Sequence, residues 1–450
     1  MKRFYLLIVF ATMMTGSLWA DNKNDTPKGI ELSNDERKLV NQNNAFAFNL
    51  FRTTRGSESQ VLSPLSITYA LGLLNNGAAG ETQKEINQVL GFGEAGAAAI
   101  NQFCRKIKNE SAALDELTKV MIANTIFFNQ NKGYVLFDDF LQKANEYYDA
   151  SPEIRPFDDG KTIDAINQWA GDHTEQMIQK VLDDQSFDPD AVSYLLNAIY
   201  FKGAWTLKFD KNNTYDEPFD GRESIPMMHM TNNIPYYNAA DYQVLVLPYG
   251  NQSYQMNIIL PHEGKTIEEV LNQIDGKNWK NDFIDLETFN VDLKLPKFEI
   301  DTDIELNDIM AELGMPRAFD MFLAEFPNFC DYPVYISLMK QVAKIKTDEE
   351  GTEAAAITVI GVKDYATPEE PEKVKFYADR PFIYVISEHS TGTIFFIGQY
   401  TGKGSTTEIN PVRLSPASDQ IYNLCGQRLS QQPQKGVYIQ NGQKRIANGN

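Results

Sequence analysis

The sequence predicts an α+β domain, because apolar residues recur at helical spacing early in the chain and strand-like apolar runs dominate later. Candidate helices cover residues 34–51, 66–74 and 162–182. Candidate strands cover residues 119–128, 192–201, 242–247, 254–260, 290–300, 334–345, 382–387 and 393–400. With 450 residues the chain is long enough to bury a large core, and it contains no visible internal repeat.

The helix at 162–182 is predicted from one apolar face that contains Ile163, Ile166, Trp169 and Ile178. Before it in the chain, Thr82 and Glu85 have the spacing of a capping box, which predicts a helix start at that point. The run at 119–128 is apolar and rich in β-branched residues, so we expect a buried strand there.

The amino terminus has the pattern of a secretory signal peptide over residues 1–20. Lys2 and Arg3 precede an apolar run at 4–14, and small residues follow up to Ala20. The apolar run is too short to span a membrane, and no cysteine stands at the expected cleavage point to carry a lipid anchor. Residues 21–35 are expected to form a polar linker. We therefore expect the mature protein to be secreted, periplasmic or held at the cell surface.

The charge of the chain restricts its partners. A net charge of -20 argues against nucleic acid and against a heparin-like polyanion, since both need clustered cations. Arg105, Lys106 and Lys108 form a small basic group, but acidic residues follow closely at 110, 115 and 116. A solvated helix face is the better interpretation of this group.

No catalytic or metal-binding pattern is present in the sequence. The four histidines, at 173, 229, 262 and 389, lack the spacing of a zinc motif, and no Gly-x-Ser-x-Gly elbow occurs. Cys104 and Cys330 each lie near a phenylalanine, where a buried inert thiol is expected. With Cys425 the chain has three cysteines, so at least one is unpaired and no disulfide framework is predicted. We expect no enzyme activity, no cofactor and no metal.

The most informative segment is 349–358, which reads EEGTEAAAIT. If residues 352–362 become a strand, successive side chains point to opposite faces. One face is then uncharged, with Thr352, Ala354, Ala356, Thr358, Ile360 and Val362, and the other holds Glu353, Ala355, Ile357, Val359, Gly361 and Lys363. Such a segment can enter the middle of a sheet with one face on the core. Glu and Ala also favour a short helix, so the sequence leaves both structures open.

This segment resembles the hinge of the serpins, the serine-protease-inhibitor family, and further motifs appear in serpin order. They are LSPLSI at 62–67, AL at 70–71, GAAGET at 77–82, NAIYFKGAW at 197–205, LPKF at 295–298, LGM at 313–315 with AF at 318–319, RPF at 380–382 and FIG at 396–398. The resemblance covers residues 36–402. It implies a large central, mostly antiparallel sheet A, smaller sheets B and C, about nine helices and an exposed reactive-centre loop at about 349–372.

By this resemblance the protein is an inhibitor and not an enzyme. A target protease cleaves the loop and forms an acyl-enzyme, and residues 352–362 then insert into sheet A and drag the protease with them. The hinge residues carried over are Glu349, Glu350, Gly351, Thr352, Glu353, Ala354, Ala355, Ala356 and Thr358. Small side chains suit this role because each must find room in a close-packed interior. The alternative, a noninhibitory serpin-fold binding protein, is disfavoured because such members usually carry bulky, charged or proline residues in this segment.

The resemblance also implies two regions that control the opening of the sheet. Ser63, Ser66 and Asn197 match the shutter, a buried polar cluster beneath the parting strands, and Gln341 stands where many serpins have histidine. Glutamine can still donate and accept hydrogen bonds. Trp205 matches the residue that covers the breach, where the loop first enters the sheet.

By analogy with the family, counting from Glu349 places the reactive bond at Tyr365–Ala366, with Lys363, Asp364 and Thr367 as alternatives. Tyr365 suits chymotrypsin-like proteases, whereas Lys363 suits trypsin-like enzymes and Ala366 or Thr367 elastase-like ones. Papain-like cysteine proteases are further candidate targets. A monomer is expected.

The composition changes after residue 402. Residues 403–450 are predicted to be a linker and a short appendage, which resembles the carboxy-terminal appendages, some of them sorting signals, of exported proteins from certain Gram-negative bacteria. A plain pair of β-strands without a sorting role is the open alternative.

Overall fold

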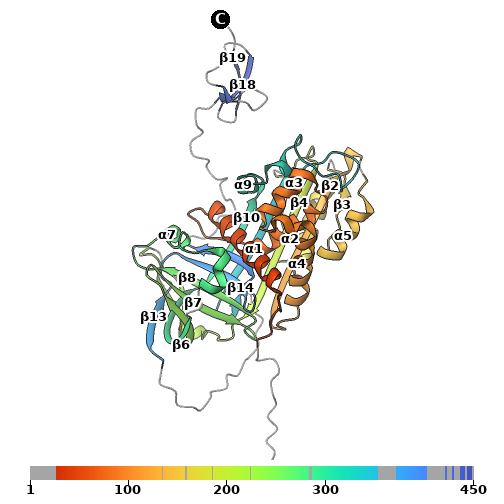
Figure 1. Cartoon of the computed structure of the whole chain (residues 1–450). Helices are drawn as coiled ribbons and strands as arrows, with labels where there is room; N and C mark the ends of the chain where they lie inside the picture. Colours follow the sequence, from red (N-terminus) through yellow and green to blue (C-terminus); the bar gives the residue numbers. More distant parts are fainter. Residues whose placement is uncertain are drawn as a thin grey trace, which may run out of the picture.

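The computed structural model describes residues 27–352 and 371–402, apart from 134, 158, 159, 185, 223 and 283–285, and the backbone of four short strands beyond residue 420. Helices and two sheets form the body of the molecule (Figure 1). The helices in these residues are α1 (Asn34–Thr54), α2 (Pro64–Asn75), α3 (Gly80–Val89), α4 (Gly96–Ser111), α5 (Asp138–Tyr148), α6 (Lys161–His173), α7 (Ile267–Leu271), α8 (Trp279–Asp282) and α9 (Asn307–Leu313).

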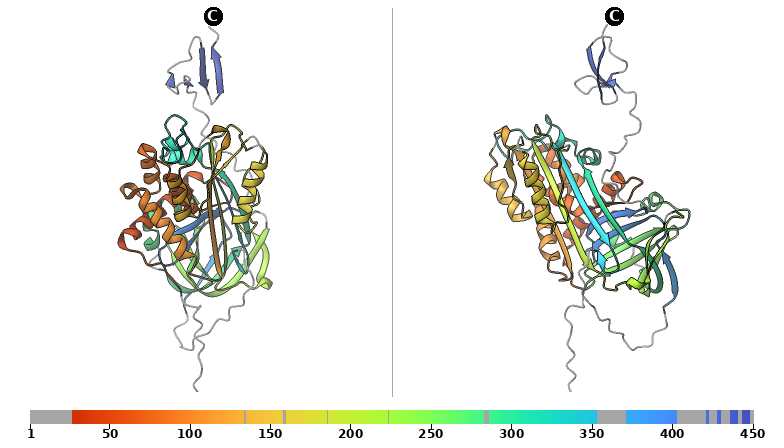
Figure 2. Two further views of the ribbon diagram at one scale, coloured as in Figure 1. Left: turned by 90° about the vertical axis from the view of Figure 1, so that its right-hand side faces the viewer. Right: turned by 180° about the vertical axis from the view of Figure 1, so that it is seen from behind.

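The first sheet has six strands in the order β10 (Phe298–Glu305), β11 (Leu338–Thr347), β12 (Gly351–Thr352), β4 (Ser193–Ala204), β2 (Thr118–Asn129) and β3 (Glu153–Arg155). β11 and β4 also pair with each other, in parallel, and β2 and β3 are parallel, whereas the other pairs are antiparallel. Its long strands lie side by side, as the view from behind shows (Figure 2, right). This sheet contains the predicted central strand and the start of the hinge, so it corresponds to the sheet A that the resemblance implies.

The second sheet has nine strands. Its order is β1 (Gln60–Leu62), β15 (Ile394–Tyr400), β14 (Phe382–Glu388), β8 (Tyr254–Pro261), β7 (Tyr242–Tyr249), β6 (Ser224–Asn238), β9 (Glu287–Pro296) and β13 (Lys373–Tyr377), with β5 (Thr214–Pro218) paired to β6. The strands expected in two smaller sheets are therefore joined by hydrogen bonds into one. The predicted α+β fold class is confirmed.

The core lies between the helices and the two sheets. Every residue of α2 is buried, and Ser63 caps this helix ahead of Pro64. A second apolar cluster covers the other face of the six-stranded sheet, where Ile166 and Ala170 of α6 pack with Tyr194 and Leu196 of β4. Each face of β4 is thus covered by apolar side chains, which fits its nearly continuous apolar sequence.

The structure corrects three predicted elements. α3 begins at Gly80 without a side-chain cap, and Thr82 instead accepts a hydrogen bond from the backbone of Glu325, 3.1 Å away. α6 ends at His173 because Glu175 and Gln176 adopt left-handed backbone angles, with φ of 50° and 65°.

The predicted strand at 290–300 is also wrong as a single element. It is two strands, β9 and β10, which end and begin on either side of Lys297 and belong to different sheets.

Both ends of the predicted domain have additional structure. Within the predicted linker at 21–35, the backbone of Lys28 and Ile30 donates hydrogen bonds to the hydroxyls of Ser253 and Ser390, at 3.0 and 2.8 Å. At the other end, β16 (Ile421–Tyr422), β17 (Arg428–Leu429), β18 (Gly436–Gln440) and β19 (Gln443–Ala447) form an antiparallel four-stranded sheet of their own.

Candidate functional site: the seam between two central strands

A buried polar cluster begins at the first turn of α2. The Ser63 hydroxyl donates to the carbonyl of Phe395 at 2.7 Å and accepts from the backbone N–H of Ser66 at 3.3 Å, so it caps the helix. The Ser66 hydroxyl lies 2.6 Å from Asn197 Oδ1. Ser63 and Ser66 are fully buried, which means that every one of these polar groups depends on protein partners.

Three amide side chains extend the cluster across three neighbouring strands. In the strand register Gln341 of β11 lies opposite Asn197 of β4, which lies opposite Asn124 of β2. Gln341 Nε2 is 2.8 Å from Asn197 Oδ1, and Asn197 Nδ2 donates to Asn124 Oδ1 at 2.7 Å. Gln341 also bonds the backbone N–H and C=O of Ser63, both at 3.1 Å. The seam between β4 and β11 is therefore closed here by neutral hydrogen bonds.

The same seam is open at its other end. β4 and β11 pair directly from Tyr194 and Leu338 as far as Ile199 and Ala343. Further along, Thr352 lies between them, opposite Gly203 of β4 and Thr347 of β11. The two residues of β12 thus form an additional strand between β4 and β11 at this end of the sheet.

Gly351 has a conformation that only glycine tolerates well. Its φ is +154°, and a Cβ atom added there would lie 2.1 Å from the carbonyl oxygen of Gly203. The backbone of the hinge consequently approaches β4 more closely than any side chain would permit.

Trp205 covers this open end. Its ring stacks on Tyr249 of the nine-stranded sheet, with centroids 4.4 Å apart, and its indole N–H donates to the carbonyl of Asp348 at 2.9 Å. The Tyr249 hydroxyl lies 2.7 Å from the Thr352 hydroxyl, and burial raises the pKa of Tyr249. Thr352 itself is fully buried, so its side chain already faces the core.

Two carboxylates fix the backbone just before β12. Glu349 pairs with Lys297 at 2.8 Å and accepts a bond from the Thr214 hydroxyl at 2.8 Å, while Glu350 pairs with Lys208 at 2.8 Å and Lys211 at 3.1 Å. Burial opposes ionisation of Glu349, but the bonds from Lys297, from its own backbone and from Thr214 outweigh it and lower the pKa. Hydrogen bonds from Lys208 and Lys211 lower the pKa of Glu350.

Comparison with known proteins identifies the family to which this fold belongs. The family model described as Serpin (serine protease inhibitor) matches residues 41–402. The chain belongs to the serpin family. Members of this family are generally protease inhibitors rather than enzymes.

Similar serpins come from distant organisms. A serpin-like protein from Thermococcus kodakarensis is 31% identical over 372 residues, which cover 81% of this chain and 85% of the relative. Iripin-2 from the tick Ixodes ricinus is 31% identical over 382 residues, covering 81% and 94%.

Solved structures have the same fold. The thermophilic serpin tengpin in its native state matches with a TM-score of 0.74 at 28% identity, over 84% of this chain and 97% of tengpin. Human thyroxine-binding globulin in complex with thyroxine matches with a TM-score of 0.72 at 26% identity, over 81% and 98%. The structural neighbours of this serpin include a thyroxine-binding protein as well as a serpin described as a serine protease inhibitor.

The structure brings together Ser63, Ser66, Asn197 and Gln341 in one cluster, and Trp205 with Glu349, Glu350, Gly351 and Thr352 at the open end. The remaining hinge and reactive-bond residues lie outside the described residues; they are Glu353, Ala354, Ala355, Ala356, Thr358, Lys363, Asp364, Tyr365, Ala366 and Thr367. Sequence reasoning missed Asn124 and Tyr249. A polar residue inside the apolar run 119–128 was the one available signal for Asn124.

The described cysteines, histidines and carboxylates do not form a nucleophilic or metal-binding site. Burial raises the pKa of both Cys104 and Cys330, so neither is an activated nucleophile. Across the described ranges no group of three or more His, Cys, Asp or Glu side chains is arranged to hold a metal ion. Nor does any helix in those ranges have the length and apolarity to cross a membrane.

The small basic group on α4 is neutralised by neighbouring acids. Arg105 pairs with Glu146 at 3.1 Å, Lys106 with Glu110 at 2.9 Å and Lys108 with Asp149 at 2.5 Å. These pairs join cations on α4 to α5 and its carboxy-terminal end, or link successive turns of α4, as in a solvated helix face.

Proposed function

We propose that this serpin inhibits serine endopeptidases as a suicide substrate. The observation that carries the proposal is the position of Thr352, which is buried between β4 and β11 and pairs with both. The first residue of the proposed inserting segment therefore already occupies the seam, in line with it. A strand that continued from Thr352 would run in the same direction as β12 and would keep the same alternation of its side chains between the two faces of the sheet.

Extending this register gives each inserting residue two neighbours. Glu353 would lie between Lys202 and Lys346, and Ala356 between Ile199 and Ala343, the last directly paired residues. Strands in a sheet are about 4.8 Å apart, so insertion must separate β4 and β11 to about twice that distance. Alanines at 354–356 can enter such a widening gap with little steric cost.

The buried polar cluster at the other end of the seam would take part in this insertion. In this register residue 358 arrives between Asn197 and Gln341, whose 2.8 Å hydrogen bond must break. The Thr358 hydroxyl can donate to one amide and accept from the other, so the buried groups regain partners. This exchange explains why a sheet that has to open is closed by neutral hydrogen bonds at this point.

The proposed reactive bond is the peptide bond between Tyr365 and Ala366, with Lys363, Asp364 and Thr367 as alternative positions. The serine of the protease attacks the carbonyl carbon of residue 365, an ester forms, and the amine of residue 366 leaves. Insertion of residues 352–362 then moves the acylated protease before water hydrolyses the ester. Tyr365 fits chymotrypsin-like enzymes, whereas Lys363 would fit trypsin-like enzymes and Ala366 or Thr367 elastase-like ones. A papain-like cysteine would form the equivalent thioester.

We further propose that the protein acts outside the cytoplasm as a monomer, after removal of residues 1–20. Amino-terminal sequencing of protein recovered from the periplasm, cell surface and medium tests this directly. A product that retains Lys2 and Arg3, or is confined to the cytoplasm, contradicts it.

The inhibitory proposal is tested by mixing the protein separately with chymotrypsin, elastase, trypsin and papain. We expect a complex that survives denaturing electrophoresis with at least one serine protease, and a released fragment whose first residue is Ala366. A different first residue moves the reactive bond but keeps the mechanism. Cleavage with no such complex for any protease contradicts inhibition and supports a noninhibitory binding protein.

A further inference from the structure

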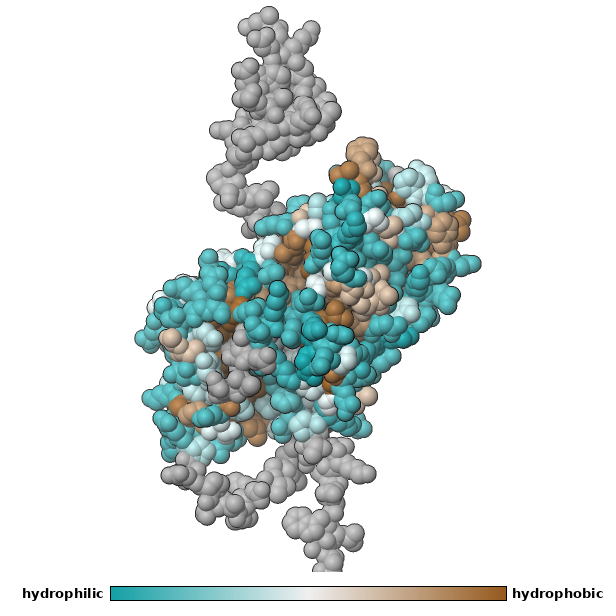
Figure 3. Space-filling model, viewed as in Figure 1, coloured by the Kyte–Doolittle hydropathy of each residue, from teal (hydrophilic) through white to brown (hydrophobic). Residues whose placement is uncertain are grey.

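Most of the exposed large apolar side chains of this serpin come from two segments whose backbones meet at a β-bridge. Eight large hydrophobic residues are exposed in the described part of the chain, and six of them come from two short segments, 135–137 and 321–332. These six are Val135, Phe137, Met321, Phe322, Leu323 and Tyr332, with exposed fractions from 41% to 85%. Apolar surface is visible at the end of the molecule where α3, β2 and β3 lie (Figure 3). We call these six residues the Phe322 surface.

The backbone beneath the Phe322 surface is firmly held. Leu136 and Cys330 form a β-bridge, and the backbone N–H of Phe137 donates to the carbonyl of Phe329 at 2.8 Å. The buried Phe329 ring packs against Phe140, with centroids 4.6 Å apart. Asp320 Oδ1 accepts the backbone N–H groups of residues 322 and 323, which holds the turn that presents them. The exposed side chains thus stand on an ordered support.

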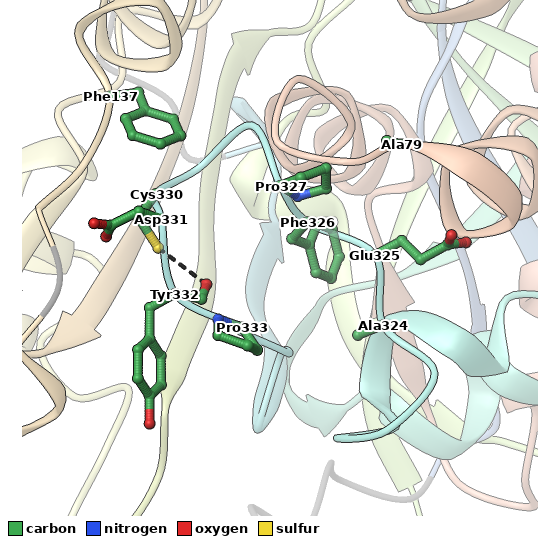
Figure 4. A pocket seen from close by; sticks show the side chains of 10 residues that line it. All are labelled: Ala79, Phe137, Ala324, Glu325, Phe326, Pro327, Cys330, Asp331, Tyr332 and Pro333. Atoms are coloured by element: carbon green, nitrogen blue, oxygen red, sulfur yellow. Dashed lines mark hydrogen bonds between the residues drawn. The ribbon is translucent and has the colours of Figure 1, made fainter.

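A hollow of about 500 Å³ opens between the two segments. Phe137, Phe326, Tyr332 and two prolines line it, and the carboxylates of Glu325 and Asp331 point outward on opposite sides (Figure 4). A hollow of this kind suits one apolar anchor, such as an aromatic or leucine side chain, within a polar rim.

Acidic residues predominate in the two segments around the hollow. Residues 135–139 and 320–333 together contain five carboxylates, Asp138, Asp139, Asp320, Glu325 and Asp331, and no lysine or arginine. Of these, Asp138, Asp139, Glu325 and Asp331 are exposed. Asp139 pairs with Lys143 at 2.7 Å, and Glu325 accepts the backbone N–H of Glu81 at 2.8 Å, so Asp138 and Asp331 are the carboxylates with which a partner's cations would pair. A second copy of this chain, with its own charge of -20, would be repelled, and so would an anionic membrane.

We propose that the Phe322 surface docks a segment of a partner protein that has an apolar anchor flanked by lysine or arginine. The anchor occupies the hollow, and the flanking cations meet the acidic rim. Exposed apolar side chains concentrated on a supported backbone are a recurrent mark of a protein interaction site. This inference is independent of the hinge, because none of the residues involved belongs to the seam between β4 and β11.

The test measures binding of labelled peptides to the full-length protein by fluorescence anisotropy. The probe is acetyl-Lys-Lys-Phe-Leu-Phe-Lys-Lys-amide, and the control peptides replace all lysines by glutamate or all three apolar residues by serine. We expect a Kd at or below ~100 µM for the probe and at least ~10-fold weaker binding of both controls. Failure of the probe to bind at 1 mM overturns the proposal, as does equal binding of the glutamate peptide.

Matched variants locate the site. Phe137→Ser combined with Tyr332→Ser replaces two exposed residues that line the hollow and is expected to weaken probe binding at least ~10-fold. Tyr215→Ser removes an exposed aromatic residue of β5, in the nine-stranded sheet, and should leave binding unchanged. Asp138→Asn with Asp331→Asn should weaken binding and reduce its dependence on salt. Equal losses in the double serine variant and in Tyr215→Ser contradict the assignment. Complex formation with a protease, measured in parallel, should be the same in all these variants.

Discussion

The two ends of the seam between β4 and β11 are held in different ways. At the open end, charged pairs surround the hinge: Glu349 with Lys297, and Glu350 with two lysines. At the closed end, Gln341 and Asn197 meet through a neutral hydrogen bond. Neutral bonds contribute about 1 kcal/mol each and can be replaced by equivalent ones, whereas an unpaired buried charge costs several.

This difference gives the two ends separate tasks. The charged end fixes where the additional strand starts and in which register, while the neutral end can open once a polar group arrives to replace the broken bond. Insertion should therefore proceed from Thr352 toward Asn197 and not in the reverse direction. The following changes test this division, beginning with the largest expected effect.

Thr352→Arg should abolish stable inhibition. The Thr352 side chain is fully buried beside Tyr249 and Thr347, and an unpaired cation there costs several kcal/mol. We expect the moles of serpin consumed per mole of protease inhibited to rise at least ~100-fold, which corresponds to about 2.7 kcal/mol. Thr352→Ser keeps the hydroxyl and should act like the natural protein. Unchanged stoichiometry for the arginine variant would show that Thr352 is not the start of insertion.

Gly351→Ala should destabilise the intact protein. The added methyl group would meet the Gly203 carbonyl, so β12 must leave the sheet, and we expect a loss of about 2 kcal/mol in the free energy of unfolding. Denaturant unfolding followed by tryptophan fluorescence measures it, since Trp205 reports this end. Gly56→Ala is the matched control, because no atom lies within 4 Å of its added Cβ. Equal stability of the two variants would mean that β12 contributes little.

Glu353→Lys should slow insertion, because the proposed register brings residue 353 between Lys202 and Lys346. We expect about a 10-fold rise in the serpin-to-protease stoichiometry from like-charge repulsion. Adding Lys346→Glu should restore most of the inhibition, whereas Lys106→Glu, on α4, should not. If the double variant with residue 346 is no better than the single one, the register is wrong.

Thr358→Val should weaken only the loop-inserted form. Loss of the hydroxyl leaves the amides of Asn197 and Gln341 without a partner between them, at a cost of about 1–2 kcal/mol. Guanidinium unfolding of the protease-cleaved protein measures this, and the intact protein should be unaffected. Thr367→Val makes the same chemical change outside the inserting residues. A similar loss of unfolding free energy in both cleaved variants, or a loss in the intact protein, would show that Thr358 does not bond to the polar cluster after insertion.

Of the two ends of the seam, acid should loosen the charged one and not the neutral one. The pKa values of Glu349 and Glu350 lie below the ordinary 4.5, so their contribution to stability is complete above that value and is lost as the pH falls through the lowered pKa values. Trp205 fluorescence should stay constant from pH 7 to about 5 and change at lower pH. Glu349→Gln with Glu350→Gln should remove that transition. A transition centred near neutrality would contradict the assignment to these carboxylates.

The sequence predicted the polar residues of the cluster better than their partners. Ser63, Ser66 and Asn197 stand in recognisable motifs, and Gln341 occupies a position where many serpins have histidine. Asn124 lies in an apolar run, and only the register between β2 and β4 places it opposite Asn197. Tyr249 reaches Trp205 because the two sheets pack together at this point, and no local pattern encodes that contact.

The incorrect elements have a similar cause. Ile178, Val181 and Leu182 are buried, so their pattern looks helical, yet they follow the left-handed pair Glu175 and Gln176 and are not part of α6. Apolar periodicity reports which residues face the core and not which backbone bonds they make. The same ambiguity joined β9 and β10 into one predicted strand.

The central claim is that the seam between β4 and β11 accepts residues 352–362 as a new strand after cleavage of the loop. Comparing the thermal unfolding of the intact protein with that of the loop-cleaved protein tests it most directly. We predict that cleavage raises the melting temperature by more than ~10 °C, because a whole buried strand adds many contributions of about 1 kcal/mol, each worth a degree or more. An unchanged or lower melting temperature after complete cleavage would contradict the claim.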